Sequence, residues 1–238
     1  MHCPECVREA RASAPRTKPA IITAFRRSSD RPVVTLSIIA VCVAIYLLQL
    51  VSGGLVTRIL LYAPQLTYVE PWRMFTALFV HASVLHILFN MYSLYIFGPV
   101  LERTLGRGRF LALYLISGFG GSVAVLVLGA GAVVGASGAI FGLMGAFFII
   151  QRGLGGNNVQ LLIVIGLNLA IGFFVPNIAW QAHLGGILIG GLVAYVFLQT
   201  RRNTQRVTQI LLVSAVGTAL LALTLLPLAI PAVLPLRL

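Results

Sequence analysis

Acidic side chains are scarce in this sequence. Its 238 residues include five Asp and Glu, and all charged residues together make up 9% of the chain. Soluble domains carry about a quarter charged residues. With 59% hydrophobic residues, the composition predicts an integral membrane protein. The acidic residues are Glu5, Glu9, Asp30, Glu70 and Glu102.

This shortage of carboxylates disfavours several kinds of membrane protein. An intramembrane aspartyl protease needs paired Asp residues, and no His-Glu-x-x-His motif of a zinc protease is present. Transporters coupled to protons or sodium usually place carboxylates within their spans. Because no acidic residue follows Glu102, a catalytic histidine beyond that point would also lack the aspartate of a triad.

Cysteine is almost as rare, with three residues in the chain. Cys3 and Cys6, preceded by His2, form a Cys-x-x-Cys pair, which is half of a tetrahedral zinc site. Cys42 falls within the first apolar run, so no second half follows. We interpret the pair as a fragment of a longer zinc-binding tail, and we expect neither a metal site nor a cofactor in this chain.

Long apolar runs are abundant, and seven of them are candidates for membrane spans, each needing roughly 20 helical residues. We therefore expect an all-α polytopic bundle, preceded by a basic tail over residues 1–32 with no cleavable signal peptide. The fourth and fifth runs are the shortest. The predicted spans are residues 33–51, 76–98, 110–129, 137–151, 159–175, 183–199 and 208–230.

The basic residues predict the orientation of these spans, because short loops rich in Lys and Arg stay on the cytoplasmic side. With the N-terminus inside and the C-terminus outside, all but three of the 17 basic residues lie on the cytoplasmic side. The three exceptions are Arg58, Arg73 and Arg237. The net charge of +12 then serves topology and attraction to anionic lipid, and we expect no nucleic-acid partner.

Four polar residues gather in the outer half of three spans that begin at the outer face. Ser137 begins the fourth span and His183 the sixth, while His86 and Asn90 share one face of the second span, about ten residues below its outer end. Each alone has a structural explanation, such as a bond to its own helix or to a neighbouring one. Their shared depth favours a serine hydrolase.

Glycines next to Ser137 and His183 would let their two helices approach closely. The His183 imidazole would then reach the Ser137 hydroxyl and activate it as a nucleophile, as a Ser-His dyad. The Ser137 amide, His86 and Asn90 are candidate donors to the oxyanion. Water would enter through a mouth formed by residues 129–135 and the loop at 176–181.

The ordered set of motifs that includes these residues resembles the rhomboid family of intramembrane serine proteases, over about residues 33–200. The motifs are Trp72-Arg73, His81, His86-Ile87-Leu88-Phe89-Asn90, Glu102 to Gly106 with Arg109-Phe110, Gly135-Ala136-Ser137-Gly138, and Ala182-His183 with Gly186 and Gly190.

The resemblance implies a six-helix core over residues 33–200 and a serine endopeptidase that cuts single-pass membrane proteins near the outer end of their helices. Ser137 would be the nucleophile, His183 the base, and His86 and Asn90 would help bind the oxyanion. The Trp72-Arg73 loop would lie partly submerged in the outer leaflet, and the fifth span would gate substrate access.

Two features depart from the family pattern. Phe141 stands where some members have a Tyr that stacks on the catalytic His, and a phenyl ring can stack in the same way. Residues 201–238, which comprise a loop and the seventh span, lie outside the core, and the role of this span does not follow from the motifs. We expect a bacterial-type plasma-membrane location.

Three other functions stay open at this level. A non-catalytic relative would bind and retain membrane clients, although it would be expected to have lost Ser137 or His183. A transporter would show inverted repeats and broken helices, and no convincing repeat is present. Acyl transfer onto lipid would use the same dyad, and only substrate profiling separates it from proteolysis. The sequence does not indicate the oligomeric state.

Overall fold

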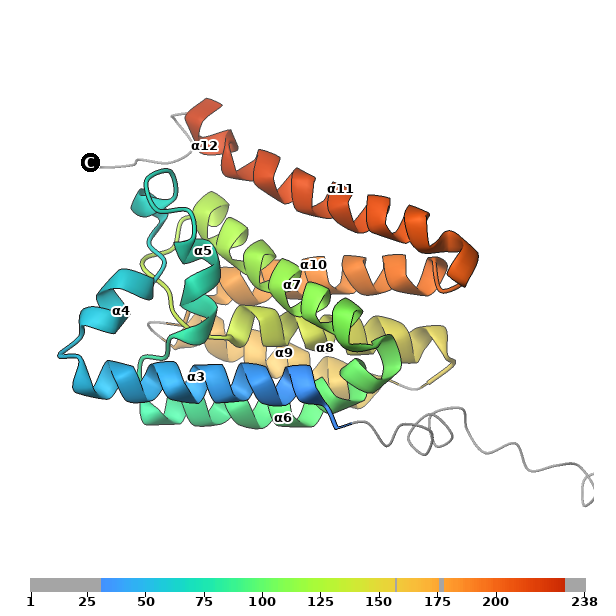
Figure 1. The fold of residues 1–238 in the computed structure, drawn as a ribbon, viewed down its shortest axis with the longest axis horizontal. Coiled ribbons are helices and arrows are strands. Elements are labelled where there is room, and N and C mark those ends of the chain that lie inside the picture. Colours follow the sequence, from blue (N-terminus) through green and yellow to red (C-terminus); the bar gives the residue numbers. More distant parts are fainter. Residues whose placement is uncertain (1–30, 157, 176–177, 230–238) are drawn as a thin grey trace, which may run out of the picture. The chain divides into compact units, whose positions relative to one another are not determined.

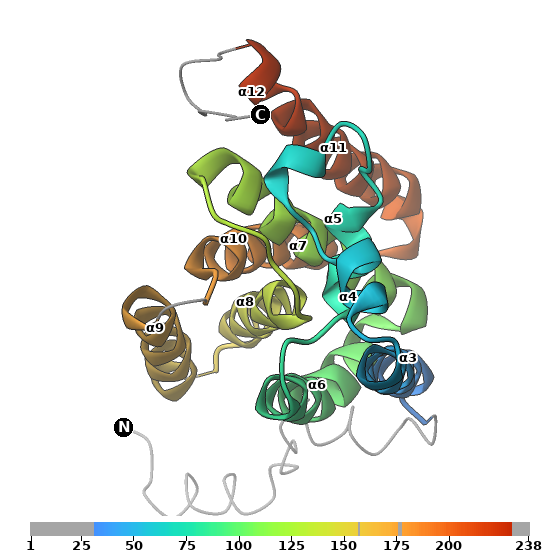
Figure 2. The same cartoon turned by 90° about the vertical axis from the view of Figure 1, so that its left-hand side faces the viewer.

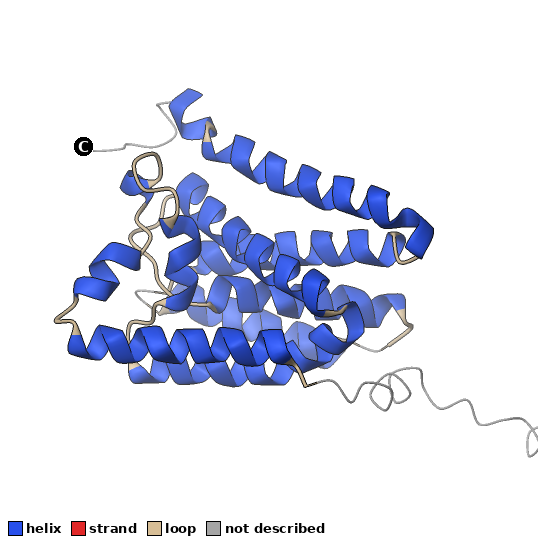
Figure 3. Ribbon diagram, viewed as in Figure 1, coloured by secondary structure: helices blue, strands red, loops and turns tan. Residues whose placement is uncertain are grey.

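The computed structural model describes residues 31–156, 158–175 and 178–229. The described residues from Pro32 onward belong to one compact unit. The Cys3 and Cys6 pair, with nearly all of the predicted basic tail, lies outside the described residues. Within the described part the chain is helical, with one isolated bridge between Tyr62 and Val133, so the predicted all-α polytopic bundle is confirmed (Figure 3).

Seven apolar helices occupy the positions of the seven predicted spans. Five segments are long and apolar enough to cross a membrane, whereas α8 and α9 are shorter, with 17 and 16 residues. The seven helices are α3 (Val33–Val51), α6 (Val84–Leu105), α7 (Arg107–Leu128), α8 (Ser137–Gly153), α9 (Val159–Phe174), α10 (Trp180–Gln199) and α11 (Arg206–Thr224).

Short helices fill the connections. The segment between α3 and α6 is the longest of them and contains four short helices, so that it forms a folded layer rather than an open loop. The short helices of the chain are α4 (Leu55–Leu60), η1 (Pro64–Leu66), α5 (Arg73–Thr76), η2 (Ala77–Phe79), η3 (Asn203–Gln205) and α12 (Leu226–Ala229).

The prediction that the second span covers residues 76–98 was wrong at both ends. The apolar run from residue 76 is folded as η2 and a turn, and α6 begins only after Ser83, whose side chain accepts a hydrogen bond from the His86 backbone N–H. Such an N-cap satisfies one of the free N–H groups of the first turn. His86 therefore lies in the first turn of α6, and its predicted depth of ten residues below the helix end was also wrong.

Two smaller corrections concern the later helices. Helix α10 begins at Trp180, three residues before the predicted start of the sixth span at His183. The seventh span is divided, because α11 ends at Thr224 and α12 follows after Leu225.

Helix α8 lies in the middle of the bundle, and Figures 1 and 2 show α10, α7, α6 and α9 around it. Ten of its 17 residues are buried. A helix that protein surrounds does not need the full thickness of the bilayer, which explains its shortness. Its first residue, Ser137, is reached through the segment at 129–136, which runs into the bundle from the end of α7.

Helix α3 is attached to α6 by a buried carboxylate. Glu102, which is 4% exposed, accepts hydrogen bonds from the backbone N–H groups of Val34 and Thr35 at 2.9 and 2.8 Å and from the Thr35 hydroxyl at 2.7 Å. The negative charge thus caps the first turn of α3, where the helix dipole favours it. Next to this contact Gly98 lies so close to Thr35 that a Cβ atom would be 2.5 Å from its methyl carbon.

Candidate active site

Ser137 and His183 meet where α8 and α10 begin. The Nε2 atom of His183 lies 3.0 Å from Oγ of Ser137, which is hydrogen-bonding distance. Ser137 is half-buried and His183 is 7% exposed. The structure therefore brings together the two residues that the sequence analysis assigned to a dyad.

Glycine contacts along α8 and α10 produce this approach. A Cβ atom at Gly186 would lie 1.9 Å from the carbonyl oxygen of Gly138, and one at Gly190 would lie 2.2 Å from that of Gly142. Real Cβ atoms essentially never approach to less than 3.0 Å. Both positions, about one and two turns after His183 in α10, therefore need glycine if the two backbones are to stay at their present separation.

The imidazole of His183 is held by packing. Its ring stacks on Phe141, with centroids 4.1 Å apart and an angle of 10° between the planes, as we expected for a phenyl ring at this position. On the side of α9, a Cβ atom at Gly172 would lie 3.5 Å from Nδ1. Within the described residues Nδ1 has no hydrogen-bond partner, so this ring is oriented by van der Waals contacts rather than by a carboxylate.

His86 lies on the other side of the serine. Its ring approaches Gly135, where a Cβ atom would be 2.7 Å from Nε2, and Gly135 has a positive φ of 120° that favours glycine. The Nδ1 atom accepts a hydrogen bond of 3.4 Å from the Ala82 backbone. A neutral imidazole that accepts at Nδ1 carries its proton on Nε2, so Nε2 is a donor that faces the segment before Ser137.

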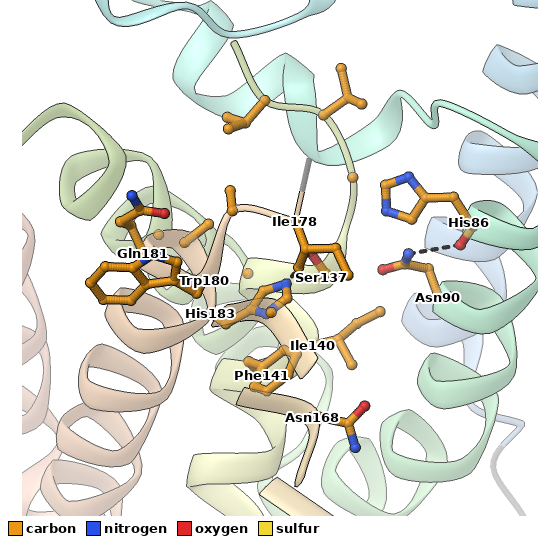
Figure 4. A pocket seen from close by; sticks show the side chains of 18 of the residues that line it. His86, Asn90, Ser137, Ile140, Phe141, Asn168, Ile178, Trp180, Gln181 and His183 are labelled. Atoms are coloured by element: carbon orange, nitrogen blue, oxygen red, sulfur yellow. Dashed lines mark hydrogen bonds between the residues drawn. The ribbon is translucent and has the colours of Figure 1, made fainter. Parts of the chain in front are cut away.

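Asn90 lies one turn below His86 on the same face of α6. It is 6% exposed, and its Nδ2 donates to the His86 carbonyl oxygen at 2.8 Å (Figure 4). Figure 4 shows His86 and Asn90 on one side of Ser137 and His183 on the other. The other three predicted site residues therefore lie around Ser137, with His183 on one side and His86 and Asn90 on the other (Figure 4).

His81, the remaining histidine of the motif set, packs edge-on against His86 with ring centroids 5.2 Å apart. It lies in the turn before α6 and is 1% exposed. Burial, together with the nearby His86, lowers the pKa of His81 to about 4. The group next to His86 is therefore neutral at pH 7.

Ser137, His183, His86 and Asn90 all line one cavity of about 1270 Å³. One wall is the segment at 129–135, and another is formed by residues 178–181, so the described parts of both segments predicted to form a water-filled mouth do line the cavity. Pro176 and Asn177 of that loop lie outside the described residues. The cavity continues between α6 and α9, where Ser93 and Asn168 line it.

Asn168 was not identified from the sequence. Its Nδ2 donates to the Val164 carbonyl oxygen one turn earlier at 2.8 Å, and Figure 4 shows it below Ile140 and Phe141. The available signal was an amide in the middle of the apolar run of the fifth span, whose other amide, Gln160, lies at its start.

The loop before α6 is held by Arg73, which is 6% exposed. Its guanidinium pairs with Glu70 and donates to the carbonyl oxygens of Arg58 and Leu61 at 2.6 and 3.1 Å. The neighbouring Trp72 side chain is 54% exposed. Arg73 thus closes the folded layer between α3 and α6 and leaves Trp72 at its surface.

Comparison with known proteins was made for the whole chain. Residues 68–200 match the family model of the rhomboid domain. RHOMBOID-like protein 1 of Arabidopsis thaliana is 44% identical over 137 residues, which cover 54% of this chain and 35% of that protein. Rhomboid protease GluP of Bacillus subtilis is 35% identical over 180 residues, covering 70% of this chain and 35% of that protein.

Rhomboid protease GlpG of Yersinia pestis is 33% identical over 195 residues, which cover 76% of this chain and 67% of that protein. This chain therefore spans about two thirds of GlpG, but about a third of the length of RHOMBOID-like protein 1 and of GluP.

Proposed function

Because the chain belongs to the rhomboid family, we propose that it is an intramembrane serine endopeptidase that hydrolyses peptide bonds in or near the transmembrane segments of other membrane proteins. The observation that carries the proposal is the 3.0 Å contact between Nε2 of His183 and Oγ of Ser137, in a cavity that His86 and Asn90 also line.

The dyad supplies both proton transfers of acyl transfer. His183 takes the proton of the Ser137 hydroxyl through Nε2 while Oγ attacks the scissile carbonyl carbon. The resulting imidazolium then gives this proton to the leaving amine, and the C–N bond breaks to leave an ester on Ser137. In the second half His183 takes a proton from water, the hydroxide attacks the ester, and Oγ leaves with the proton returned by His183.

The stacked Phe141 ring takes the place of an orienting carboxylate. It fixes the plane of the imidazole, with the centroids 4.1 Å apart, so Nε2 stays directed at Oγ throughout the cycle. An aromatic face also favours the cationic form of His183 that exists between the two proton transfers. A dyad without an acidic member can therefore keep its geometry.

Three donors are available to the negative charge that develops on the carbonyl oxygen. The backbone N–H of Ser137 lies in the first turn of α8, where N–H groups have no acceptor within the helix and the dipole favours an anion. The Nε2 proton of His86 and the side-chain amide of Asn90 approach from α6. Preorganised donors of this kind are worth about 100- to 1,000-fold each in rate.

The substrate reaches the dyad between α6 and α9. Figure 2 shows these helices on either side of α8, and the cavity between them is lined by Phe97, Asn168 and Phe173. Displacement of α9 would admit a single transmembrane helix from the bilayer. That helix must be unwound at the cut, because its peptide groups are hydrogen-bonded internally. Polar side chains that line the cavity, such as Ser93 and Asn168, would bind the released groups.

Orientation and location belong to the same proposal. The distribution of Lys and Arg favours a cytoplasmic N-terminus and a dyad near the outer face. The proposed location is a bacterial-type plasma membrane. Residues 33–200 form the catalytic core in this proposal, residues 1–32 a cytoplasmic tail, and residues 201–238 an added C-terminal span. The lipid bilayer and single-pass membrane proteins are the partners.

Labelling with a fluorophosphonate tests the proposal. Detergent-solubilised protein should be labelled, and Ser137→Ala and His183→Ala should each remove labelling, because the reagent reports an activated serine. Ser93→Ala, a serine on the wall of the same cavity, is the matched control and should be labelled like the wild type.

Cleavage of a reconstituted single-pass substrate should likewise be lost in Ser137→Ala and in His183→Ala. A folded wild-type protein that is not labelled would instead indicate a client-binding relative. Labelling with turnover of lipid and no peptide cleavage would indicate lipid acyl transfer.

A further inference from the structure

Helix α11 lies outside the part of the chain that matches the rhomboid domain, which ends at residue 200. Figure 1 shows it running along α10, and Figure 2 shows it and α9 on opposite sides of α8. It contacts the bundle at each of its two ends, and the two contacts differ in kind.

One end is fixed by a buried glutamine. Gln209, which is 6% exposed, accepts a hydrogen bond from Nε of Arg109 at 2.7 Å. Its amide donates to the Thr200 carbonyl oxygen at 3.0 Å and to the Thr200 hydroxyl at 2.8 Å. This side chain ties α11 to the beginning of α7 and the end of α10, at the end of the bundle far from the dyad.

The other end lies in a buried cluster that joins residues of the folded layer between α3 and α6 to residues of α7. Leu220 is 3% exposed and belongs to a buried cluster with Tyr62, Met74 and Phe119. One turn later, the carbonyl oxygen of Thr224 accepts a hydrogen bond of 2.9 Å from the Tyr68 hydroxyl. Residues separated by more than 150 positions in the sequence are thus in direct contact.

The same layer holds the backbone that leads into Ser137. Tyr62 and Val133 exchange both of their backbone hydrogen bonds, at 3.1 and 2.7 Å, and the Ala77 carbonyl oxygen accepts from the Gly135 N–H at 2.9 Å. The Ser122 hydroxyl of α7 donates to the Met74 carbonyl oxygen at 2.7 Å. Residues of the cluster around Leu220 therefore fix the segment that ends two residues before the nucleophile.

We infer that α11 is a positioning element for the active site: through Leu220 and Thr224 it presses the layer at 62–77 against the segment at 133–135 and so sets the position of the Ser137 turn. This inference rests on the proposed function. Helix α11, which we call the brace, lies on the side of α8 opposite α9 (Figure 2), and the substrate is proposed to enter next to α9. Loss of the brace should therefore lower the rate of acylation while substrate binding is kept.

Two adjacent leucines give a matched test. Leu220 is 3% exposed, whereas Leu221 is 58% exposed and faces away from the bundle. A geometric error of about 1 Å at a reacting centre can cost about 100-fold in rate. Leu220→Ala should thus lower both kcat on a reconstituted single-pass substrate and the fluorophosphonate labelling rate by about tenfold or more, with KM within twofold of wild type. Leu221→Ala should leave kcat, KM and labelling unchanged.

General destabilisation is separated from positioning by two further variants. Thr35→Val removes one hydrogen bond to Glu102 at the α3–α6 contact, and it should lower the melting temperature without lowering kcat. Leu220→Met conserves the volume of the side chain, so it should keep the wild-type kcat that Leu220→Ala loses. If Leu220→Ala does not fold, Tyr68→Phe removes only the bond to Thr224 and should lower kcat several-fold at unchanged KM.

The inference is overturned if Leu220→Ala, or Tyr68→Phe in its place, keeps the wild-type kcat, raises KM instead, or loses no more activity than Thr35→Val. These outcomes differ from failure of the proposed function. If the proposed function fails, the wild-type protein itself is not labelled. If only the inference fails, the wild type is labelled through Ser137, and the variants Leu220→Ala and Tyr68→Phe behave like the wild type.

Discussion

Replacement of Gly186 by alanine should abolish most of the activity, because it increases the distance between α8 and α10. The added Cβ would lie 1.9 Å from the Gly138 carbonyl oxygen, and 3.0 Å is the closest approach that real Cβ atoms show. The α8 and α10 backbones must therefore separate by about 1.1 Å at this point. Because Gly138 and Gly186 lie next to the dyad on the two helices, this shift is transmitted to Ser137 and His183.

The dyad has no room for such a shift. Its Oγ to Nε2 distance of 3.0 Å would grow to about 4 Å, which is beyond hydrogen-bonding range. A misplacement of this size costs about 100-fold in rate, and overpacking of the interface costs about 1–3 kcal/mol of stability. We expect Gly186→Ala to lower kcat/KM about 100-fold and to melt at a lower temperature.

Gly191 supplies the control, because it lies on the same helix but away from the close contact. A Cβ atom there would be 3.6 Å from a side-chain carbon of Ile149, which is an ordinary van der Waals distance. Gly191→Ala should therefore keep full activity, and its better helix propensity should raise stability by up to about 1 kcal/mol. The assay is cleavage of a fluorogenic transmembrane peptide in proteoliposomes, with melting followed in detergent. Wild-type activity in Gly186→Ala, or equal losses in both variants, would refute the reasoning.

Three further predictions follow from single contacts. Asn90→Ala should lower kcat about 100-fold, as for the loss of one oxyanion donor, without changing the melting temperature; an unchanged kcat would remove Asn90 from the oxyanion site. Phe141→Leu removes a stacked aromatic pair worth about 0.5–1.5 kcal/mol, so kcat should fall about two- to tenfold, whereas Phe141→Tyr should retain activity; equal rates for both would show that stacking does not orient His183. Glu102→Gln leaves the donors of Val34 and Thr35 facing an amide and should cost about 1–3 kcal/mol; a melting temperature equal to wild type would contradict this role, and kcat below the transition should not change.

Much of the architecture follows from local sequence. Long apolar runs and scarce charge can only be satisfied by membrane helices, because every backbone polar group in lipid must be bonded within its own helix. The seven helices were therefore predictable to within a few residues at most ends. The start of α6 was not, because residues 76–83 are as apolar as a span but are folded against the layer that contains Arg73 and Tyr62. Whether an apolar segment faces lipid or protein is decided by non-local packing.

The sequence by itself determined that this is a polytopic all-α membrane protein of the rhomboid family. It also placed Ser137 and His183 near the starts of two separate helices, although α10 begins at Trp180 rather than at His183. It also indicated close packing of α8 and α10 through their glycines, since only residues without a Cβ allow two backbones to touch. Tertiary structure decided what no periodicity contains: the stacking of Phe141 on His183, the direction of the His86 ring, the capping of α3 by Glu102 and the burial of Leu220 in one cluster with Tyr62 and Met74. Each of these joins residues that are far apart in the chain, so its geometry exists only after the helices have packed.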